Sequence, residues 1–268
     1  MSDGAYTPGW SPHASAFMER RTADSHGQEI LGHLRPGMDL LDLGCGPGSV
    51  TVGLARAVAP GRVTAIDREA SQIALLVGRA AAEGVSNVEA VAGDALALPL
   101  ADASVDAVFS HALFEHLPDP VAALREVIRV VRPGGVVVVV SPDWGGFVLA
   151  PAEPEVEEAI RFYERIQTAN GGDVRAGRSL GAHMRRAGLA EVAMSARYEV
   201  YEDRAAIADY LASRIEASPD QDHSVELGWA SAANVRGLAR ALREWSAIPG
   251  GMFAQAWISA TGRVPSGG

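Results

Sequence analysis

The stretch that decides the fold is Leu40-Leu-Asp-Leu-Gly-Cys-Gly-Pro-Gly-Ser-Val-Thr51. Its leucines are typical of a buried strand, and its three glycines let the backbone reverse and approach a ligand closely, which a Cβ would prevent. Pro47 and Ser49 are expected to open a helix that ends at Pro60-Gly61. Free amides and the helix dipole meet where such a helix follows a strand, so we expect a ligand site at this turn.

The spacing of the glycines narrows the class of ligand. A dinucleotide-binding fingerprint has the pattern G-x-G-x-x-G, and Ser49 stands where its third glycine would be. The pattern found here, Asp42-x-Gly44-x-Gly46-x-Gly48, resembles motif I of the class I S-adenosylmethionine-dependent methyltransferases. The resemblance implies S-adenosyl-L-methionine as cofactor. It also implies a Rossmann-like α/β fold with a seven-stranded, mostly parallel sheet, an antiparallel final hairpin and helices on both faces.

The composition bounds the kind of protein. With 268 residues, 48% of them hydrophobic, the chain can bury a complete α/β core, and one domain with insertions fits this length. A net charge of −10 argues against a nucleic-acid substrate, because phosphate binding needs a basic surface. No apolar run is long enough to span a membrane and no signal segment is seen at the N-terminus, so we expect a cytoplasmic protein.

Hydrophobic periodicity predicts the other elements. We expect helices over about 14–34, 70–83, 120–132, 151–168, 178–187, 204–217 and 231–247, and strands over 62–67, 88–91, 104–110, 136–140, 190–200 and 252–260. Ile73, Leu76 and Val77 are expected on the inward face of the second of these helices. The segment Asp143-Trp-Gly-Gly-Phe147 is expected to be a turn.

Further cofactor contacts are expected beyond the glycines. Asp67 ends the second strand, where its carboxylate can accept hydrogen bonds from both ribose hydroxyls of a nucleoside. Asp94, after the third strand, either accepts from the adenine amine beside the Ala95 amide or caps its own turn. The other candidates for cofactor binding are Tyr6, Arg21, Arg68 and Ser110.

Two further patterns refine the resemblance. Asp106-Ala-Val-Phe-Ser110 and the later Arg132-Pro-Gly-Gly135 are similar to the small-molecule branch of the family. The Tyr6-Thr7 arm, the segment 143–146 and the segment 170–178 resemble natural-product methyltransferases of actinobacteria, which are related to the ubiquinone and menaquinone C-methyltransferases. This resemblance implies a hydrophobic small-molecule acceptor in secondary metabolism.

The same resemblance implies a domain organisation. We expect an N-terminal arm or lid helix over 1–36 and a methyltransferase domain over 37–268, with lid insertions at about 143–177 and 203–249. The oligomeric state stays open, with a homodimer or a higher homo-oligomer as the possibilities.

The methyl transfer that the resemblance implies suggests which residues could be catalytic. Methyl transfer is mostly a matter of holding the acceptor in line with the methyl group, and removal of a proton adds less. His111, His13 and Asp143 are candidates for a base or a substrate anchor, whereas His116 is expected to point away. The histidines lack the spacing of metal ligands, so we expect no metal.

The last group of candidates is aromatic. Trp10, Trp144, Phe147 and Tyr163 could line an apolar pocket for the acceptor, although packing in the core is the alternative for each of them. Two other functions remain open. One is a protein that binds the cofactor without methylating, and the other is a nucleotide-dependent oxidoreductase.

Overall fold

The computed structural model describes residues 18–217, 225 and 228–266, which fall into two compact units. Within the described residues, unit 1 comprises 142–175 and the part of the chain from 197 to 257; unit 2 comprises 18–141, 176–196 and 258–266. Each unit has a hydrophobic core of its own. Tyr6, Trp10 and His13, which belong to the predicted site, lie outside the described residues.

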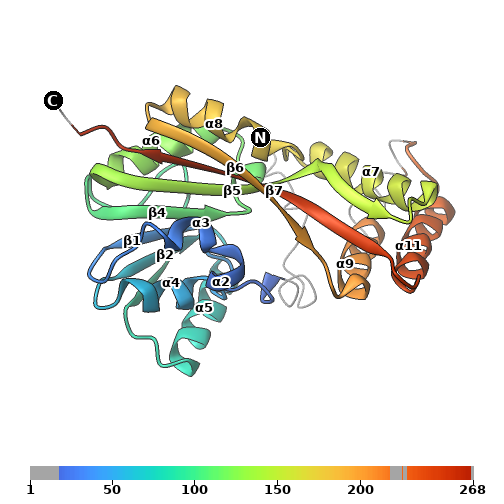
Figure 1. The fold of residues 1–268 in the computed structure, drawn as a ribbon, viewed down its shortest axis with the longest axis horizontal. Coiled ribbons are helices and arrows are strands. Elements are labelled where there is room, and N and C mark those ends of the chain that lie inside the picture. The colour runs from blue at the N-terminus through green and yellow to red at the C-terminus, as the bar shows by residue number, and fades with distance from the viewer. Residues whose placement is uncertain (1–17, 218–224, 226–227, 267–268) are drawn as a thin grey trace. The chain divides into compact units, whose positions relative to one another are not determined.

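Seven strands of the described chain form one sheet in the order β3-β2-β1-β4-β5-β7-β6 (Figure 1). Neighbours from β3 to β5 pair in parallel, and β5-β7-β6 forms the antiparallel end, so the predicted Rossmann-like fold is confirmed. The order switches at β1, which lies between β2 and β4, and such a point leaves a ligand crevice at the carboxyl ends of the strands. The strands are β1 (Leu40–Leu43), β2 (Val63–Asp67), β3 (Val88–Ala92), β4 (Val105–His111), β5 (Val131–Ala150), β6 (Ala190–Val200) and β7 (Met252–Arg263).

The helices of unit 2 pack in neighbouring pairs, α4 against α5 and α6 against α8. A short 3₁₀ helix, η1, follows β4. The helices of this unit are α2 (Ala23–His26), α3 (Gln28–Leu31), α4 (Thr51–Val58), α5 (Ala70–Ala82), η1 (Phe114–His116), α6 (Pro120–Val130) and α8 (Ala176–Ala187).

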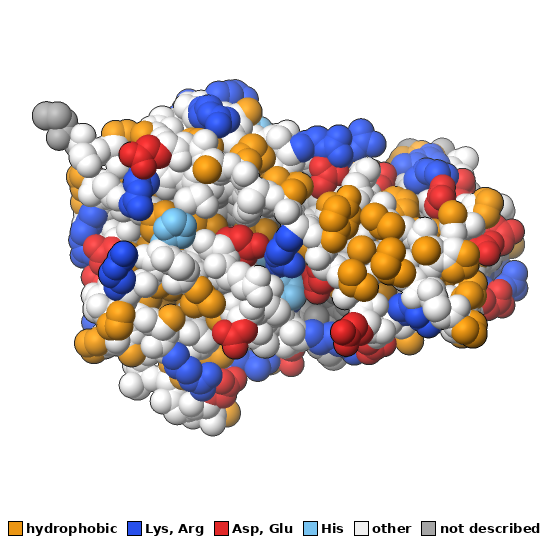
Figure 2. All heavy atoms as spheres, viewed as in Figure 1, with side chains coloured by type: hydrophobic (Ala, Val, Ile, Leu, Met, Phe, Trp, Pro, Cys, Tyr) orange, Lys and Arg blue, Asp and Glu red, His pale blue; other side chains and the backbone are white. Residues whose placement is uncertain are grey.

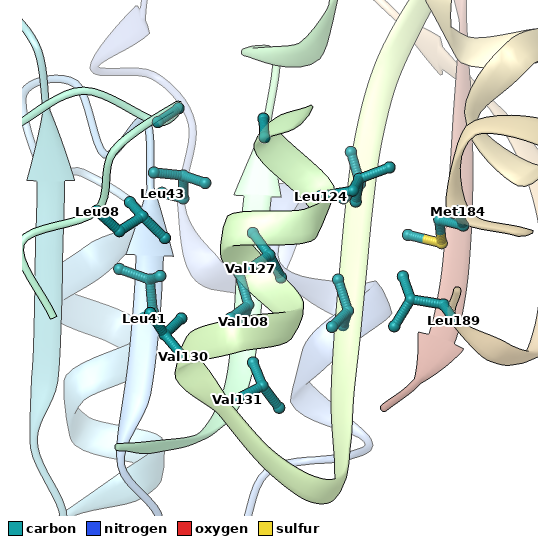
Figure 3. Packing of buried hydrophobic residues seen from close by; sticks show 14 of the residues in the cluster. Leu41, Leu43, Leu98, Val108, Leu124, Val127, Val130, Val131, Met184 and Leu189 are labelled. Carbon is teal, nitrogen blue, oxygen red and sulfur yellow. The ribbon is translucent and has the colours of Figure 1, made fainter. Parts of the chain in front are cut away.

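The core of unit 2 forms where α6 packs on the strands (Figure 3). Leu124 and Val127 of α6 belong to one buried cluster with Leu41 of β1 and Val108 of β4. Asp119 begins the helix, because its side chain accepts a hydrogen bond from a backbone amide of the first turn. Full burial of each such apolar side chain stabilises the fold by roughly 1.5–3 kcal/mol, so this packing holds the ends of the strands in place.

In unit 1, the helices α7 (Pro154–Ala169), α9 (Arg204–Glu216) and α11 (Ala232–Ser246) surround a second buried cluster. Asp203 and Ser231 cap α9 and α11 through side-chain hydrogen bonds to backbone amides. The Arg204 guanidinium donates to the carbonyl oxygens of Ser246 and Ile248 at 3.2 and 3.1 Å, which ties the start of α9 to the end of α11. These helices overlap the segments predicted as insertions.

Two helix predictions are wrong in detail. The helix expected over 14–34 is, in its described part, the short pair α2 and α3 with Gly27 between them. Thr22 starts α2 with a capping box, and a Cβ on Gly27 would lie 2.8 Å from the Ala23 carbonyl oxygen. On α5, Val77 is 54% exposed instead of facing inward, because the buried stripe recurs every four residues, at Gln72, Leu76 and Ala80.

The strand expected over 136–140 is also wrong in extent, since β5 covers Val131–Ala150. The Arg132-Pro-Gly-Gly135 segment remains inside it as an irregularity, because the β4–β5 pairing is shifted there. The Gly134 amide donates to the carbonyl oxygen of Val264, just after β7, so residues whose sequence is typical of a turn are bonded to a distant segment. The turn expected over 143–147 likewise lies within β5.

Candidate functional site

The turn between β1 and α4 is held open by glycines in left-handed conformations. Gly44, Gly46 and Gly48 have φ angles of +76°, +51° and +81°, a region that other residues adopt at a cost. The amides of Gly44 and Cys45 both donate to the Ile66 carbonyl oxygen, at 2.7 and 3.1 Å, which ties the turn to β2.

The three glycines meet different surroundings. A Cβ on Gly48 would lie 2.2 Å from Leu76 Cδ1, and a Cβ on Gly44 would lie 2.9 Å from Leu113 Cβ, so these two positions are packed. A Cβ on Gly46 would have no heavy atom of the described chain within 4 Å. The turn therefore faces open space at Gly46, as a ligand-binding turn requires.

Asp67, at the carboxyl end of β2, reaches this turn. Its Oδ2 accepts from the Gly46 amide at 2.9 Å, and its Oδ1 accepts from the Glu69 amide at 3.0 Å. A carboxylate has about four acceptor positions, so two remain for a ligand. Burial raises the pKa of Asp67 above its usual value, while the two backbone hydrogen bonds oppose that shift.

Asp42, predicted from the same motif, is turned into the protein. Its carboxyl group is buried, and Thr51 Oγ1 donates to its Oδ2 at 2.6 Å, which ties β1 to the first residue of α4. Burial raises the pKa of Asp42 to about 6; the Asp67 charge adds to this shift and the Thr51 hydrogen bond opposes it. In the structure this aspartate acts as a brace for the turn.

The remaining predicted cofactor residues take varied positions. Asp94 is exposed, and its Oδ1 accepts from the Leu96 amide at 2.9 Å, so it caps its own turn as one interpretation proposed; Ala95 beside it is buried. Arg68 is exposed and Arg21 is half-buried. A cofactor contact for each of these residues stays a prediction.

The end of β4 carries two buried polar residues, Ser110 and His111. Ser110 is fully buried, and its Oγ has no hydrogen-bond partner among the described residues. The His111 ring packs edge-on against the ring of His26, with 5.1 Å between the centroids. His26 is 5% exposed and was missed by the sequence analysis, because a lone histidine in a short helix carries no recognisable pattern.

The 3₁₀ helix η1, which follows β4 in the chain, carries a second polar cluster that the sequence did not reveal. Glu115 is 3% exposed; its Oε2 accepts from Ser141 Oγ at 2.9 Å, and its Oε1 lies 3.8 Å from His116 Nε2. Burial and the charge of Arg21 lower the pKa of His116 to about 4. His116 is partly buried, with 16% of its side chain exposed, and its expected orientation away from the site stays a prediction.

The aromatic candidates of unit 1 belong to its core. The rings of Trp144 and Tyr163 meet edge-on at 4.9 Å, and both side chains are buried. Phe147 stacks on Phe253 with 6.0 Å between the centroids. Asp143 is also buried in unit 1, whereas His111 belongs to unit 2.

The described residues contain no group of three His, Cys, Asp or Glu side chains placed to hold a metal ion. No helix among them is both long and apolar enough to cross a membrane.

The glycine turn and its partners all lie in a segment that matches a known family. Residues 41–139 match the family model described as a methyltransferase domain. Residues 41–139 of this chain are therefore similar to a methyltransferase domain. This match lies wholly within unit 2 and includes the three glycines, Asp67 and the end of β4.

Curated relatives agree with the methyltransferase domain. The chain is 39% identical over 157 residues to an uncharacterised 37.1 kDa protein in transposon TN4556 of Streptomyces fradiae, covering 58% of this chain and 44% of the relative. It is 34% identical over 168 residues to an uncharacterised methyltransferase of Schizosaccharomyces pombe, covering 60% and 59%. It is 42% identical over 106 residues to the demethylmenaquinone methyltransferase of Staphylococcus aureus, covering 39% and 43%. The chain thus spans about half the length of these relatives.

Solved structures agree on the fold of the methyltransferase domain. YcgJ of Bacillus subtilis superposes with a TM-score of 0.60 at 20% identity, covering 89% of this chain and 99% of that one. The cyclase SpnF superposes with a TM-score of 0.54 at 20% identity, covering 95% and 82%. Phosphoethanolamine N-methyltransferase 2 of Haemonchus contortus, solved with S-adenosylhomocysteine, superposes with a TM-score of 0.55 at 17% identity, covering 96% and 53%.

Proposed function

We propose that this protein is an S-adenosyl-L-methionine-dependent methyltransferase that methylates a hydrophobic small molecule in secondary metabolism. The observation that carries the proposal is the turn after β1, where Asp67 accepts a hydrogen bond from the Gly46 amide and a Cβ on Gly46 would meet open space. The methyltransferase domain over 41–139 supports it. Further support comes from the name of the Staphylococcus aureus relative and from the bound S-adenosylhomocysteine in the Haemonchus contortus structure.

The residues of unit 2 fit this cofactor. Asp67 keeps two acceptor positions for ribose hydroxyls beyond its bonds from Gly46 and Glu69. The buried Ser110 Oγ has no partner among the described residues, so a bound ligand would complete its hydrogen bonding. The further residues proposed to hold the cofactor are Tyr6, Arg21, Asp42, Gly44, Gly48, Arg68, Asp94 and Ala95.

The chain would act mainly by positioning. When bound, the cofactor supplies a methyl group on a sulfonium, which is already a good leaving group. Holding an acceptor at attack distance can lower the barrier by about 7–11 kcal/mol. His111 is proposed to take a proton from acceptors that must lose one, a contribution of roughly 10²–10⁴ in rate, and its contact with His26 restrains its ring. His13 and Asp143 are the other candidates for this role.

The acceptor is proposed to bind with help from the aromatic residues Trp10, Trp144, Phe147 and Tyr163. The arm over 1–36 and the insertions at about 143–177 and 203–249 are proposed to form a substrate lid. Figure 2 shows acidic and basic side chains interspersed on the face that it draws, which fits a small-molecule acceptor better than a nucleic acid.

The ribose role of Asp67 gives the most direct test. We expect Asp67→Ala to weaken S-adenosylhomocysteine binding, measured by calorimetry, by about 10- to 100-fold, which corresponds to losing a charge-assisted hydrogen bond of roughly 1.5–3 kcal/mol. Glu89→Ala is the matched control, because Glu89 is an exposed carboxylate on β3 that pairs with Arg62. Equal affinities of wild type and Asp67→Ala would refute the assignment. Binding of NAD in place of S-adenosylhomocysteine would instead favour an oxidoreductase.

A second candidate is a protein that binds the cofactor without transferring its methyl group. The likeness in fold to the cyclase SpnF favours this candidate, since that structure shows the fold in a protein described as a cyclase. Mass spectrometry of reactions with S-adenosylmethionine and aromatic acceptors separates the two. A methylated product supports methyl transfer, whereas tight cofactor binding with no product from any acceptor supports the second candidate.

A further inference from the structure

The strand β6 forms one edge of the sheet. It pairs with β7, and no other strand of the described chain lies on its outer side (Figure 1). An edge strand presents backbone amides and carbonyls that can pair with another chain, so proteins usually protect such edges with charged residues, proline or a covering helix.

The two faces of β6 differ in character. Met194, Tyr198 and Val200 are 42%, 55% and 53% exposed, which is a high exposure for large apolar and aromatic side chains. Side chains alternate between the two faces of a strand, so these three residues share one face. Every residue on that face is apolar or aromatic: Ala190, Val192, Met194, Ala196, Tyr198 and Val200. The charged residues of the strand are all on the other face: Glu191, Arg197 and Glu199.

Contacts with β7 determine which way each residue of β6 points. Ser195 Oγ lies 2.8 Å from Ser259 Oγ, so the odd-numbered residues of β6 share a face with Ser259. The Tyr201 amide donates to the Phe253 carbonyl oxygen at 3.0 Å. Because the backbone groups of successive residues point to opposite sides of a strand, those of the even-numbered residues point to the open edge. The residues of the apolar face are therefore also those whose amides and carbonyls can pair with another chain.

The opposite edge of the sheet is better protected than β6. There β3 is only five residues long, its Glu89 forms an ion pair with Arg62 at 3.2 Å, and α5 packs against it. In β6 the left-handed Glu191, with a φ of +51°, precedes a regular segment from Val192 to Val200 that contains no proline. β6 is thus the longer and more open edge.

A second copy of β6 is an occupant whose charges can be checked register by register. In an antiparallel pair of identical strands, the register is defined by the residue at its centre. A pair centred on Ser195 would place Glu191 opposite Glu199 of the second copy, and a pair centred on Arg197 would place two arginines opposite each other. Like charges directly opposite are destabilising, so both registers are disfavoured.

The apolar face selects among the remaining registers. Centring on Met194 or on Tyr198 leaves Val200 or Met194, respectively, without an opposite residue within the strand. Centring on Ala196 places Val192 opposite Val200 and Met194 opposite Tyr198. Valine pairs and contacts of a methionine sulfur with an aromatic ring are both favourable. This register therefore gives every large side chain of the apolar face an apolar partner.

We propose that two copies of this chain form a dimer in which their β6 strands pair antiparallel about Ala196. A two-fold axis relates the copies, so each contact between them occurs twice. The backbone groups of the open edge bond to the second copy, and its strand covers the exposed side chains of Met194, Tyr198 and Val200. The pairing uses residues of one strand and does not depend on the cofactor or the methyl acceptor.

Disulfide cross-linking tests the register. Opposite residues of a hydrogen-bonded antiparallel pair have Cα atoms about 5.5 Å apart, which a disulfide can span. We therefore expect Ala196→Cys to give disulfide-linked dimers on oxidation, seen on non-reducing gels. Ala193→Cys is the matched control, because Ala193 is an exposed alanine of the same strand whose two copies would lie roughly 20 Å apart. Both variants keep the buried Cys45, so any cross-link through that residue would appear in both.

The mass in solution and a charged variant test the dimer itself. We expect light scattering to give the mass of two chains for the wild type. Tyr198→Lys places a charge in the apolar contact and should weaken the dimer about tenfold or more, measured by sedimentation over a dilution series. Leu75→Lys is the matched control, because Leu75 is also an exposed apolar residue, at 43%, but lies on α5. If Tyr198→Lys does not fold, Val200→Lys takes its place with the same expected effect.

Three outcomes overturn the proposal. The first is a wild type that is monomeric at about 100 μM. The second is a dimer that Tyr198→Lys leaves as strong as Leu75→Lys does, since the copies would then meet elsewhere. The third is a failure of Ala196→Cys to cross-link, or cross-linking of Ala193→Cys to the same extent.

Discussion

Two titratable residues of unit 2 have pKa values shifted towards their neutral forms. Asp42 has its pKa raised to about 6 by burial, and His116 has its pKa lowered to about 4 by burial and by Arg21. In unfolded chains these groups titrate near 3.9 and 6.5. The two shifts therefore make opposite contributions to the dependence of stability on pH.

For Asp42, the folded protein holds a proton between about pH 4 and pH 6 that the unfolded chain has released. Its contribution to the free energy of unfolding therefore falls as the pH rises through this range. Asp42→Asn removes the charge and keeps an acceptor for Thr51. We expect this variant to be more stable than wild type by up to about 3 kcal/mol at pH 7 and by close to nothing at pH 4, measured by urea unfolding. A gain that is equal at both pH values would contradict the assignment.

For His116 the sign is reversed. Between about pH 4 and pH 6.5 the unfolded chain binds a proton that the folded protein does not, so this contribution to stability is lost as the pH falls. His116→Gln lacks this contribution, so its stability relative to the wild type should rise by about 3 kcal/mol between pH 7 and pH 4. Urea unfolding of both proteins at the two pH values measures the difference. The same change with pH in both proteins would show that His116 is already protonated in the folded state at pH 4.

A helix or strand could be predicted from the sequence where its buried residues recur at one regular spacing from end to end. The boundaries of α5 and β2 were predicted to within about a residue, because Leu76 and Ala80 repeat on one face and Val63 begins a continuous buried run. β5 was not, because Gly134 and Gly135, which are typical of a turn, hydrogen-bond to Val264 just after β7, a contact made with a distant segment.

The same distinction applies to the candidate site. The meeting of Gly46 with Asp67 could be anticipated, because the parallel strands β1 and β2 end at the same edge of the sheet. The contact of His26 with His111 could not, since it joins a short N-terminal helix to a strand far along the chain and leaves no pattern in either. Buried polar contacts of this kind depend on tertiary packing.

The glycine turn between β1 and α4 gives a prediction at the scale of the structural element. Gly46→Ala should cost about 1–2 kcal/mol of stability from its left-handed conformation alone. Gly48→Ala carries the same conformational cost and also a clash with Leu76, so we expect it to be the more destabilising. Thermal unfolding measures both. We also expect Gly46→Ala to bind S-adenosylhomocysteine more weakly, because the added Cβ would enter the open space beside the turn. If Gly46→Ala binds with full affinity, the ligand binds elsewhere.

At the scale of the whole molecule, the chain has two hydrophobic cores, one in each unit. The methyltransferase domain matched over 41–139 lies in unit 2, which also holds the glycine turn and Asp67. Unit 1 contains the helices α7, α9 and α11 and the proposed acceptor contacts. We therefore expect a mutation in the core of one unit to leave ligand binding by the other unit unchanged.

Truncating one buried residue in each unit tests whether the two cores unfold independently. Leu124 and Ile160 are each about 1% exposed, the first in the core of unit 2 and the second in that of unit 1, and truncation of either to Ala should cost about 2–5 kcal/mol. S-adenosylhomocysteine at about 100 times its dissociation constant adds roughly 2.7 kcal/mol to the part that binds it. We expect it to restore the thermal transition lowered by Leu124→Ala and to leave the one lowered by Ile160→Ala in place, measured by calorimetry. Equal restoration of both would mean that the two cores unfold as one, because ligand bound to unit 2 would then stabilise unit 1 to the same extent.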